Sequence, residues 1–112
     1  MSETRKINLH HESRAIAGSV QLTGSKSESN RALVIQALSN GKVTVNNLSE
    51  AADTVTMVRA LDAAKHAVPG KLTTIDVGPA GTAMRFLTSY LSITSGDFVL
   101  TGSKRMQERP IQ

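Results

Sequence analysis

The most constraining feature of this sequence is a helical pattern with a strand pattern on either side. Apolar residues recur at i, i+3, i+4, i+7 and i+8, which predicts a helix with one apolar face: Ala83, Phe86, Leu87, Tyr90 and Leu91. Residues 72–77 and 97–101 are short runs bounded by turn residues, and each predicts a strand. Strands that alternate with helices indicate an α/β architecture.

The first half of the chain shows the same order with weaker patterns. Strands are predicted at residues 6–9, 19–23 and 42–46. Ser25, followed three residues later by Glu28, forms a capping box that predicts the start of a helix. Residues 31–38 of this helix are apolar on nearly every side, so we expect it to be buried between layers. Asn40-Gly41 is expected to end it.

A second helix is predicted after Ser49, which we interpret as its N-cap. Glu50 and Asp53 fall in its first turn, where the positive end of a helix favours acidic side chains. We therefore interpret both as helix-start residues rather than as a catalytic acid pair. The expected apolar stripe of this helix consists of Val55, Val58 and Leu61.

Composition limits the classes of function. The 112 residues are one domain's worth, and 13 basic against 9 acidic residues give a net charge of +4. A basic chain favours anionic partners, which include nucleic acid, anionic membranes and phosphorylated metabolites. The absence of cysteine excludes disulfides and thiolate chemistry. The histidines and carboxylates lack a ligand spacing, so no metal site is expected. No apolar run approaches the roughly 18 residues of a membrane span, and we expect a cytoplasmic protein.

Three basic segments that contain glycine each follow a predicted strand, and they are the candidate binding sites. A strand that runs into a glycine turn and then a helix exposes backbone N–H groups that accept phosphate or carboxylate. Arginine can hold such an anion with two parallel hydrogen bonds. The candidate residues are Lys26, Ser27 and Arg31 in the first segment, Gly81, Thr82 and Arg85 in the second, and Arg109 in the third. The first segment is not a nucleotide P-loop, because Ser25 separates Gly24 from Lys26.

One short sequence occurs twice. Residues 22–26 read LTGSK, and the same letters recur at residues 100–104. Each copy has an arginine nine residues after its leucine, at Arg31 and Arg109. Two readings remain open, because Thr-Gly-Ser is common where strands run into turns. Either the match reflects that preference, or a supersecondary unit that presents a basic loop is repeated.

The same three segments resemble the signature motifs of one family. Residues 24–33 read GSKSESNRAL, close to the pattern G-S-K-S-x-S-N-R-A-L of the enolpyruvyl transferases, and of the EPSP synthases in particular. Residues 81–85 match the A-G-T-A-M-R segment of that family, and residues 105–111 match R-M-x-E-R-P-I. The three motifs occur in the family's order and at compatible spacing, so the resemblance is specific.

The resemblance implies an activity and its substrates. EPSP synthases transfer the enolpyruvyl group of phosphoenolpyruvate to the 5-hydroxyl of shikimate 3-phosphate, within the shikimate pathway, and they release phosphate without a metal or organic cofactor. The implied partners are these two anions rather than nucleic acid or a membrane. The implied roles are contact with both substrates for Lys26, shikimate 3-phosphate binding for Ser27 and Arg31, phosphoenolpyruvate binding for Gly81 and Arg109, and support for Thr82 and Arg85. No residue is assigned a catalytic role.

Two positions depart from the family pattern. The family usually has Asn where this chain has Pro79, and often Pro where it has Phe86. Phe86 belongs to the predicted apolar face, so we expect it to pack in the core. Both departures would reshape the phosphoenolpyruvate loop and could change the response to inhibitors.

The resemblance also implies a larger fold. Members of the family are roughly four times this length and form two similar halves, each an inside-out α/β barrel of βαβαββ units, with the active site between them. Residues 1–21 would be an N-terminal strand segment of the opposite half, poorly ordered or mispaired here, and residues 22–112 a partial N-terminal substrate-binding domain. We therefore expect a fragment that needs the C-terminal part of the same enzyme and is inactive alone.

Three alternatives remain at this point. A related transferase acts on UDP-N-acetylglucosamine with the same fold, although the Lys-Ser-x-Ser-Asn-Arg segment favours shikimate 3-phosphate. A small basic nucleic-acid-binding module would suit the net charge, but the chain lacks a basic stripe with interleaved aromatic residues. A purely structural domain is the third.

Overall fold

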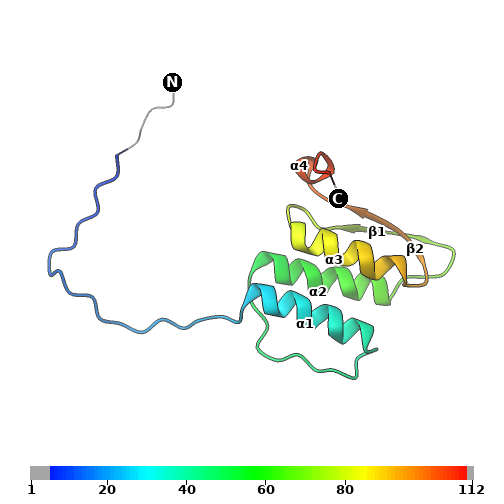
Figure 1. Ribbon diagram of the computed structural model, residues 1–112, viewed down its shortest axis with the longest axis horizontal. Helices are drawn as coiled ribbons and strands as arrows, with labels where there is room; N and C mark the ends of the chain where they lie inside the picture. The colour runs from blue at the N-terminus through cyan, green and yellow to red at the C-terminus, as the bar shows by residue number, and fades with distance from the viewer. Residues whose placement is uncertain (1–5, 111–112) are drawn as a thin grey trace.

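The computed structural model describes residues 6–110, in which three long helices lie side by side and the second and third of them contact a two-stranded sheet (Figure 1). The order of elements is α1 (Lys26–Leu38), α2 (Ala52–Lys65), β1 (Leu72–Asp76), α3 (Gly81–Ser92), β2 (Asp97–Thr101) and α4 (Lys104–Gln107). The strands β1 and β2 are parallel, with Leu72 opposite Asp97 and Ile75 opposite Leu100. The predicted α/β architecture is confirmed.

The strand–helix–strand unit at the end of the chain follows its sequence pattern closely. Parallel strands need a crossover connection, and α3 supplies it between β1 and β2. Ala83 and Leu87 on α3 are fully buried, and the other three residues of the predicted face, Phe86 among them, pack partly buried around the core. The prediction that Phe86 has a packing role is confirmed.

Helix α1 begins and ends as predicted, but it is not buried on all sides. The Oγ of Ser25 accepts a hydrogen bond from the backbone N–H of Glu28 at 3.4 Å, and Gly41 has a φ of +77° at the other end. Leu33 is 4% exposed, whereas Ile35 and Leu38 are 55% and 52% exposed. The expectation of a helix between layers is wrong, because α1 packs on α2 and α3 along one side.

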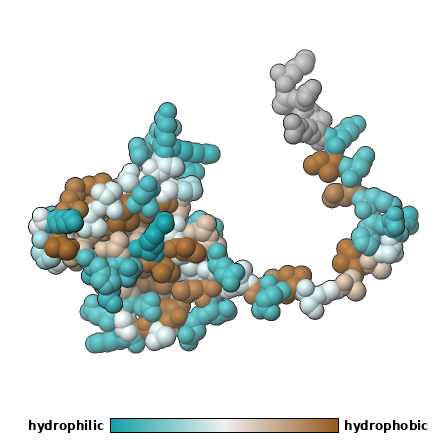
Figure 2. Space-filling view, turned by 180° about the vertical axis from the view of Figure 1, so that it is seen from behind, coloured by the Kyte–Doolittle hydropathy of each residue, from teal (hydrophilic) through white to brown (hydrophobic). Residues whose placement is uncertain are grey.

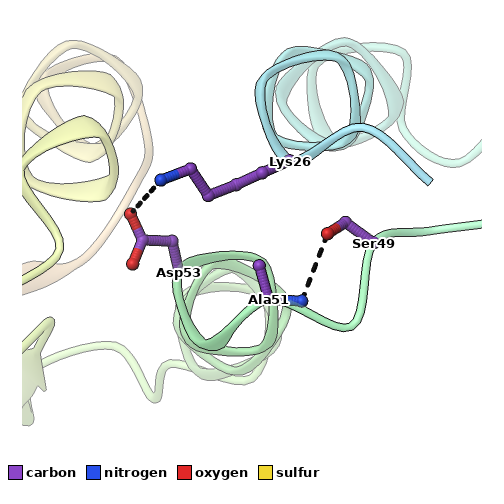
Figure 3. Close-up of polar contacts among 4 residues, drawn as sticks. All are labelled: Lys26, Ser49, Ala51 and Asp53. Atoms are coloured by element: carbon purple, nitrogen blue, oxygen red, sulfur yellow. Dashed lines mark hydrogen bonds and ion pairs between the residues drawn. The ribbon is translucent and has the colours of Figure 1, made fainter. Parts of the chain in front are cut away.

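Helix α2 begins two residues later than predicted. Ala51 occupies the N-cap position without a side-chain cap, so the assignment of Ser49 as N-cap is wrong. The backbone N–H of Ser49 instead donates to the Oγ of Ser29 at 2.9 Å, and its own Oγ accepts from the N–H of Ala51 at 3.1 Å (Figure 3).

The predicted apolar stripe of α2 is also wrong in part. Leu61 is buried, but Val55 and Val58 are exposed. The buried face consists of Thr54, Met57, Ala60, Leu61 and Ala64. Small residues such as Ala60 and Ala64 allow α2 to pack against α1, α3 and β1 at once.

The three strands predicted in the first half do not form. Within residues 6–110 the sheet contains only β1 and β2, which pair with each other. No further strand therefore pairs with the segments predicted as strands, which are residues 6–9, 19–23 and 42–46. Residues 6–22 extend away from the helices, and their apolar side chains stand exposed between polar ones (Figures 1 and 2). Residues 1–5 of the predicted segment 1–21, and Ile111 of the third motif, lie outside the described residues. No helix in the described range is long and apolar enough to cross a membrane.

Candidate functional site

The two copies of the repeated sequence have the same local structure at their serines. The Oγ of Ser25 accepts a hydrogen bond from the backbone N–H three residues later at 3.4 Å, and it caps α1. The Oγ of Ser103 accepts from the N–H three residues later at 3.3 Å, and it caps α4. Each copy therefore starts a helix in the same way.

The glycine of each copy lies against a backbone carbonyl of a neighbouring loop. A Cβ on Gly24 would collide with the carbonyl oxygen of Asn47, and one on Gly102 would lie 2.7 Å from that of Gly78. Only glycine allows this approach without displacing the neighbouring loop. The two copies are therefore alike around their glycine and serine, but a strand, β2, precedes only the second copy, and both readings of the repeat stay open.

A cavity of about 450 Å³ opens where the second and third basic segments meet. Parallel strands end at the same edge of a sheet, so β1 and β2 bring the start of α3 beside α4 (Figure 1). The lining residues are Asp53, Gly81, Thr82, Met84, Arg85, Met106, Arg109 and Pro110. Four of the seven predicted binding residues thus share one cavity: Gly81, Thr82, Arg85 and Arg109.

The start of α3 supplies donors as well as charge to this cavity. No side-chain hydrogen bond caps α3, whose N-cap position is held by Ala80 within the described chain. The first N–H groups of a helix have no partner inside the helix, so an uncapped start accepts an anion readily. A Cβ placed on Gly81 would lie 3.7 Å from the Nη1 atom of Arg109, which puts that guanidinium directly beside the helix start.

Lys26 reaches the edge of this cavity through an ion pair that the sequence did not predict. Its Nζ lies 3.6 Å from the Oδ2 of Asp53, and the two side chains are 51% and 30% exposed. Figure 3 shows Lys26 extending from α1 to the carboxylate at the start of α2. Asp53 does lie in the first turn of α2, as expected. No local sequence signal identifies its partner, because the pair depends on how α1 packs against α2.

Two predicted binding residues lie elsewhere on α1. Ser27 and Arg31 are exposed and do not line the cavity. The Nη1 of Arg31 donates a hydrogen bond to the backbone carbonyl of Ser27 at 3.1 Å. This contact holds the guanidinium along its own helix. The structure therefore separates these two residues from the cluster of Gly81 and Arg109.

Pro79 lies in the loop before α3, at the edge of a second and smaller cavity. That cavity measures about 240 Å³ and adjoins the first, since Met106 and Arg109 line both. Its other lining residues are Ser103 and Arg105. Within residues 6–110, no three histidine, aspartate or glutamate side chains gather as metal ligands would.

Comparisons with known proteins agree on one family. A family model described as EPSP synthase (3-phosphoshikimate 1-carboxyvinyltransferase) matches residues 11–112. A 3-phosphoshikimate 1-carboxyvinyltransferase of Bacteroides fragilis is 50% identical over 97 residues, which are 87% of this chain and 22% of that protein.

More distant relatives carry the same name. The protein of Pectobacterium atrosepticum is 40% identical over 120 residues, covering 90% of this chain and 28% of its own length. That of Hamiltonella defensa is 42% identical over 127 residues, covering 96% of this chain and 29% of its own length. The chain therefore spans about a quarter of the length of the curated relatives that it matches.

Proposed function

The chain belongs to the EPSP synthase family, and from that membership we propose that it forms the N-terminal part of a 3-phosphoshikimate 1-carboxyvinyltransferase. The whole enzyme would transfer the enolpyruvyl group of phosphoenolpyruvate to the 5-hydroxyl of shikimate 3-phosphate and release phosphate. The observation that carries this proposal is the cavity that combines the uncapped start of α3 with Arg85 and Arg109.

This cavity has the chemistry of an anion site. The backbone N–H of Gly81 and the guanidinium of Arg109 provide donors side by side, and Arg85 adds a second positive charge. Phosphoenolpyruvate carries a carboxylate and a phosphate close together, and two arginines beside a helix start would suit both. We propose that Gly81 and Arg109 hold phosphoenolpyruvate and that Thr82 and Arg85 support them.

Helix α1 would hold the second substrate. We propose that Ser27 and Arg31 bind shikimate 3-phosphate and that Lys26 contacts both substrates. The position of Lys26 supports this division, because its ammonium pairs with Asp53 at the edge of the cavity, whereas the other two residues do not line it. Lysine would then lie between the two anions and keep them in register for the reaction.

The remaining groups of the active site would come from the other three quarters of the enzyme. Fixed cations can stabilise the charge that moves onto departing phosphate, but an addition and elimination also require proton transfer. We propose that residues 22–112 are a partial substrate-binding domain and that residues 1–21 join the opposite half. The chain alone would then be inactive. Cytoplasmic location stays a prediction.

A chimera tests the proposal. The matching 97-residue segment of the Bacteroides fragilis protein would be replaced by that of this chain, and phosphate release from the two substrates measured. We expect an active enzyme, and Arg109→Met in the chimera should lower kcat/KM by about 100-fold or more, the scale of losing one oriented donor. Lys71→Met is the control, since Lys71 is exposed and does not line the cavity. A folded but inactive chimera, or equal effects of the two substitutions, would contradict the proposal.

A further inference from the structure

One carboxylate lies among the cations of the proposed anion site. Asp53 lines the cavity together with Arg85 and Arg109, and its Oδ2 is 3.6 Å from the Nζ of Lys26. A carboxylate lowers the attraction of a site for anions, so its presence at this place needs a reason. Its place in the first turn of α2 favours a carboxylate, but that effect needs no contact with Lys26.

We propose that Asp53 is a positioning residue, which holds the ammonium of Lys26 at the edge of the cavity so that it meets a bound anion there. The proposal rests on the proposed function of the cavity, and it gives Asp53 a task in addition to its place at the start of α2.

The chemistry of lysine explains why such a residue is required. Lysine carries a point charge on a flexible four-carbon stem, so its position is not defined by its backbone. Lys26 begins α1, whereas the cavity is formed by α2, α3 and α4, and the side chain must cross the gap between helices (Figure 3). An ammonium has three N–H donors. It can therefore stay paired with Asp53 and still offer N–H donors to a ligand.

The exposure of the pair indicates that it sets geometry more than stability. Both side chains remain partly in water, at 51% for Lys26 and 30% for Asp53. Ion pairs of this kind contribute little to the folded state and are screened by salt. Loss of the pair should therefore leave the fold intact and release the lysine side chain.

The first measurement needs no ligand. Nuclear magnetic resonance relaxation gives the order parameter of the Cε methylene of Lys26 in the chain itself. We expect it to exceed that of Lys42, an exposed lysine with no carboxylate within 4.0 Å in the described chain, and to fall to the Lys42 value in Asp53→Asn. Asp53→Glu, which keeps the charge, should restore part of the order. An unchanged order parameter in Asp53→Asn would overturn the proposal.

The second measurement separates positioning from plain charge. Inorganic phosphate is titrated into the chain, and binding is followed through the amide signals of Gly81 and Thr82. In the unaltered chain, Asp53→Asn should weaken phosphate binding by about 3- to 5-fold, the scale of a partly exposed ion pair. In a chain that already carries Lys26→Met, the same substitution should not weaken phosphate binding. If Asp53→Asn strengthens binding equally in both chains, Asp53 acts only as a negative charge and the proposal is wrong. If no variant binds phosphate while the first measurement succeeds, the proposed function fails and the positioning of Lys26 stands.

Discussion

Replacing Gly102 with alanine adds one methyl group where β2 runs into the turn before α4. The new Cβ would lie 2.7 Å from the carbonyl oxygen of Gly78 and 2.9 Å from the Cγ of Met106, well inside the 3.4 Å at which ordinary contact begins. The same carbonyl accepts a hydrogen bond from the N–H of Ser103 at 2.9 Å. The loop that starts at Gly78 would have to move, and Gly81 of the cavity lies at its end.

The size of the effect follows from these contacts. An extra methyl group in a packed site costs about 1–3 kcal/mol, and here the closest neighbour is backbone, which yields less than the end of a side chain. We expect Gly102→Ala to lower the free energy of unfolding by about 2 kcal/mol. For a domain of this size that corresponds to a Tm lower by roughly 8–16 °C. Phosphate binding should weaken as well, because the displaced loop carries the start of α3.

Thermal and urea denaturation followed by circular dichroism at 222 nm would measure this change. Gly18→Ala is the matched control, since no atom lies within 4 Å of its added Cβ and its φ is not left-handed. The reasoning is refuted if the two variants unfold within about 0.5 kcal/mol of each other, the usual range of surface substitutions.

Three further substitutions test other parts of the structure. Leu87→Ala should lower the free energy of unfolding by about 3 kcal/mol, because Leu87 is 0% exposed and its truncation leaves a cavity. The midpoint of urea denaturation should fall, while the dependence of the unfolding free energy on urea concentration stays the same. Thr54→Val should raise the free energy of unfolding by about 1 kcal/mol, since the buried Oγ1 of Thr54 has no hydrogen-bond partner within the described residues. A lower Tm of this variant would show that the hydroxyl has a partner. Ser25→Ala removes the cap of α1 and should cost about 1 kcal/mol, with faster amide exchange at Glu28; an unchanged exchange rate would mean that the cap is not formed in solution.

The parts of the fold that could be predicted are those that a local pattern determines. The spacing on α3, the cap at Ser25 and the glycine at Gly41 each act within a few residues, and all three are present in the structure. The stripe of α2 depends on which neighbours surround the helix. Val55 is more apolar than Thr54, yet Thr54 faces the core and Val55 faces solvent. Similarly, residues 19–23 have a strand pattern but no strand beside them in the described chain.

The candidate site shows the same limit. The motifs single out Gly81 and Arg109, and their binding role stays a prediction; their proximity follows from the parallel pairing of β1 and β2. Ser27 and Arg31 belong to the same motif as Lys26, but neither of them lines the cavity that Lys26 approaches. The sequence predicted Asp53 as a first-turn residue of α2 but not as the partner of Lys26. No pattern in one sequence links a carboxylate on one helix to a lysine on another.

The parallel pairing of β1 and β2 also determines when the cavity can form. Leu72 and Asp97 pair across a connection that contains the whole of α3, and closing such a long segment is slow compared with forming a helix. We expect α1 and α2 to acquire structure before the two strand ends come together during folding. The anion site is then assembled in the last step. A ligand that binds only the completed fold would stabilise it by RT ln(1 + [L]/Kd), where [L] is the free ligand concentration, and ligand binding would then report complete folding.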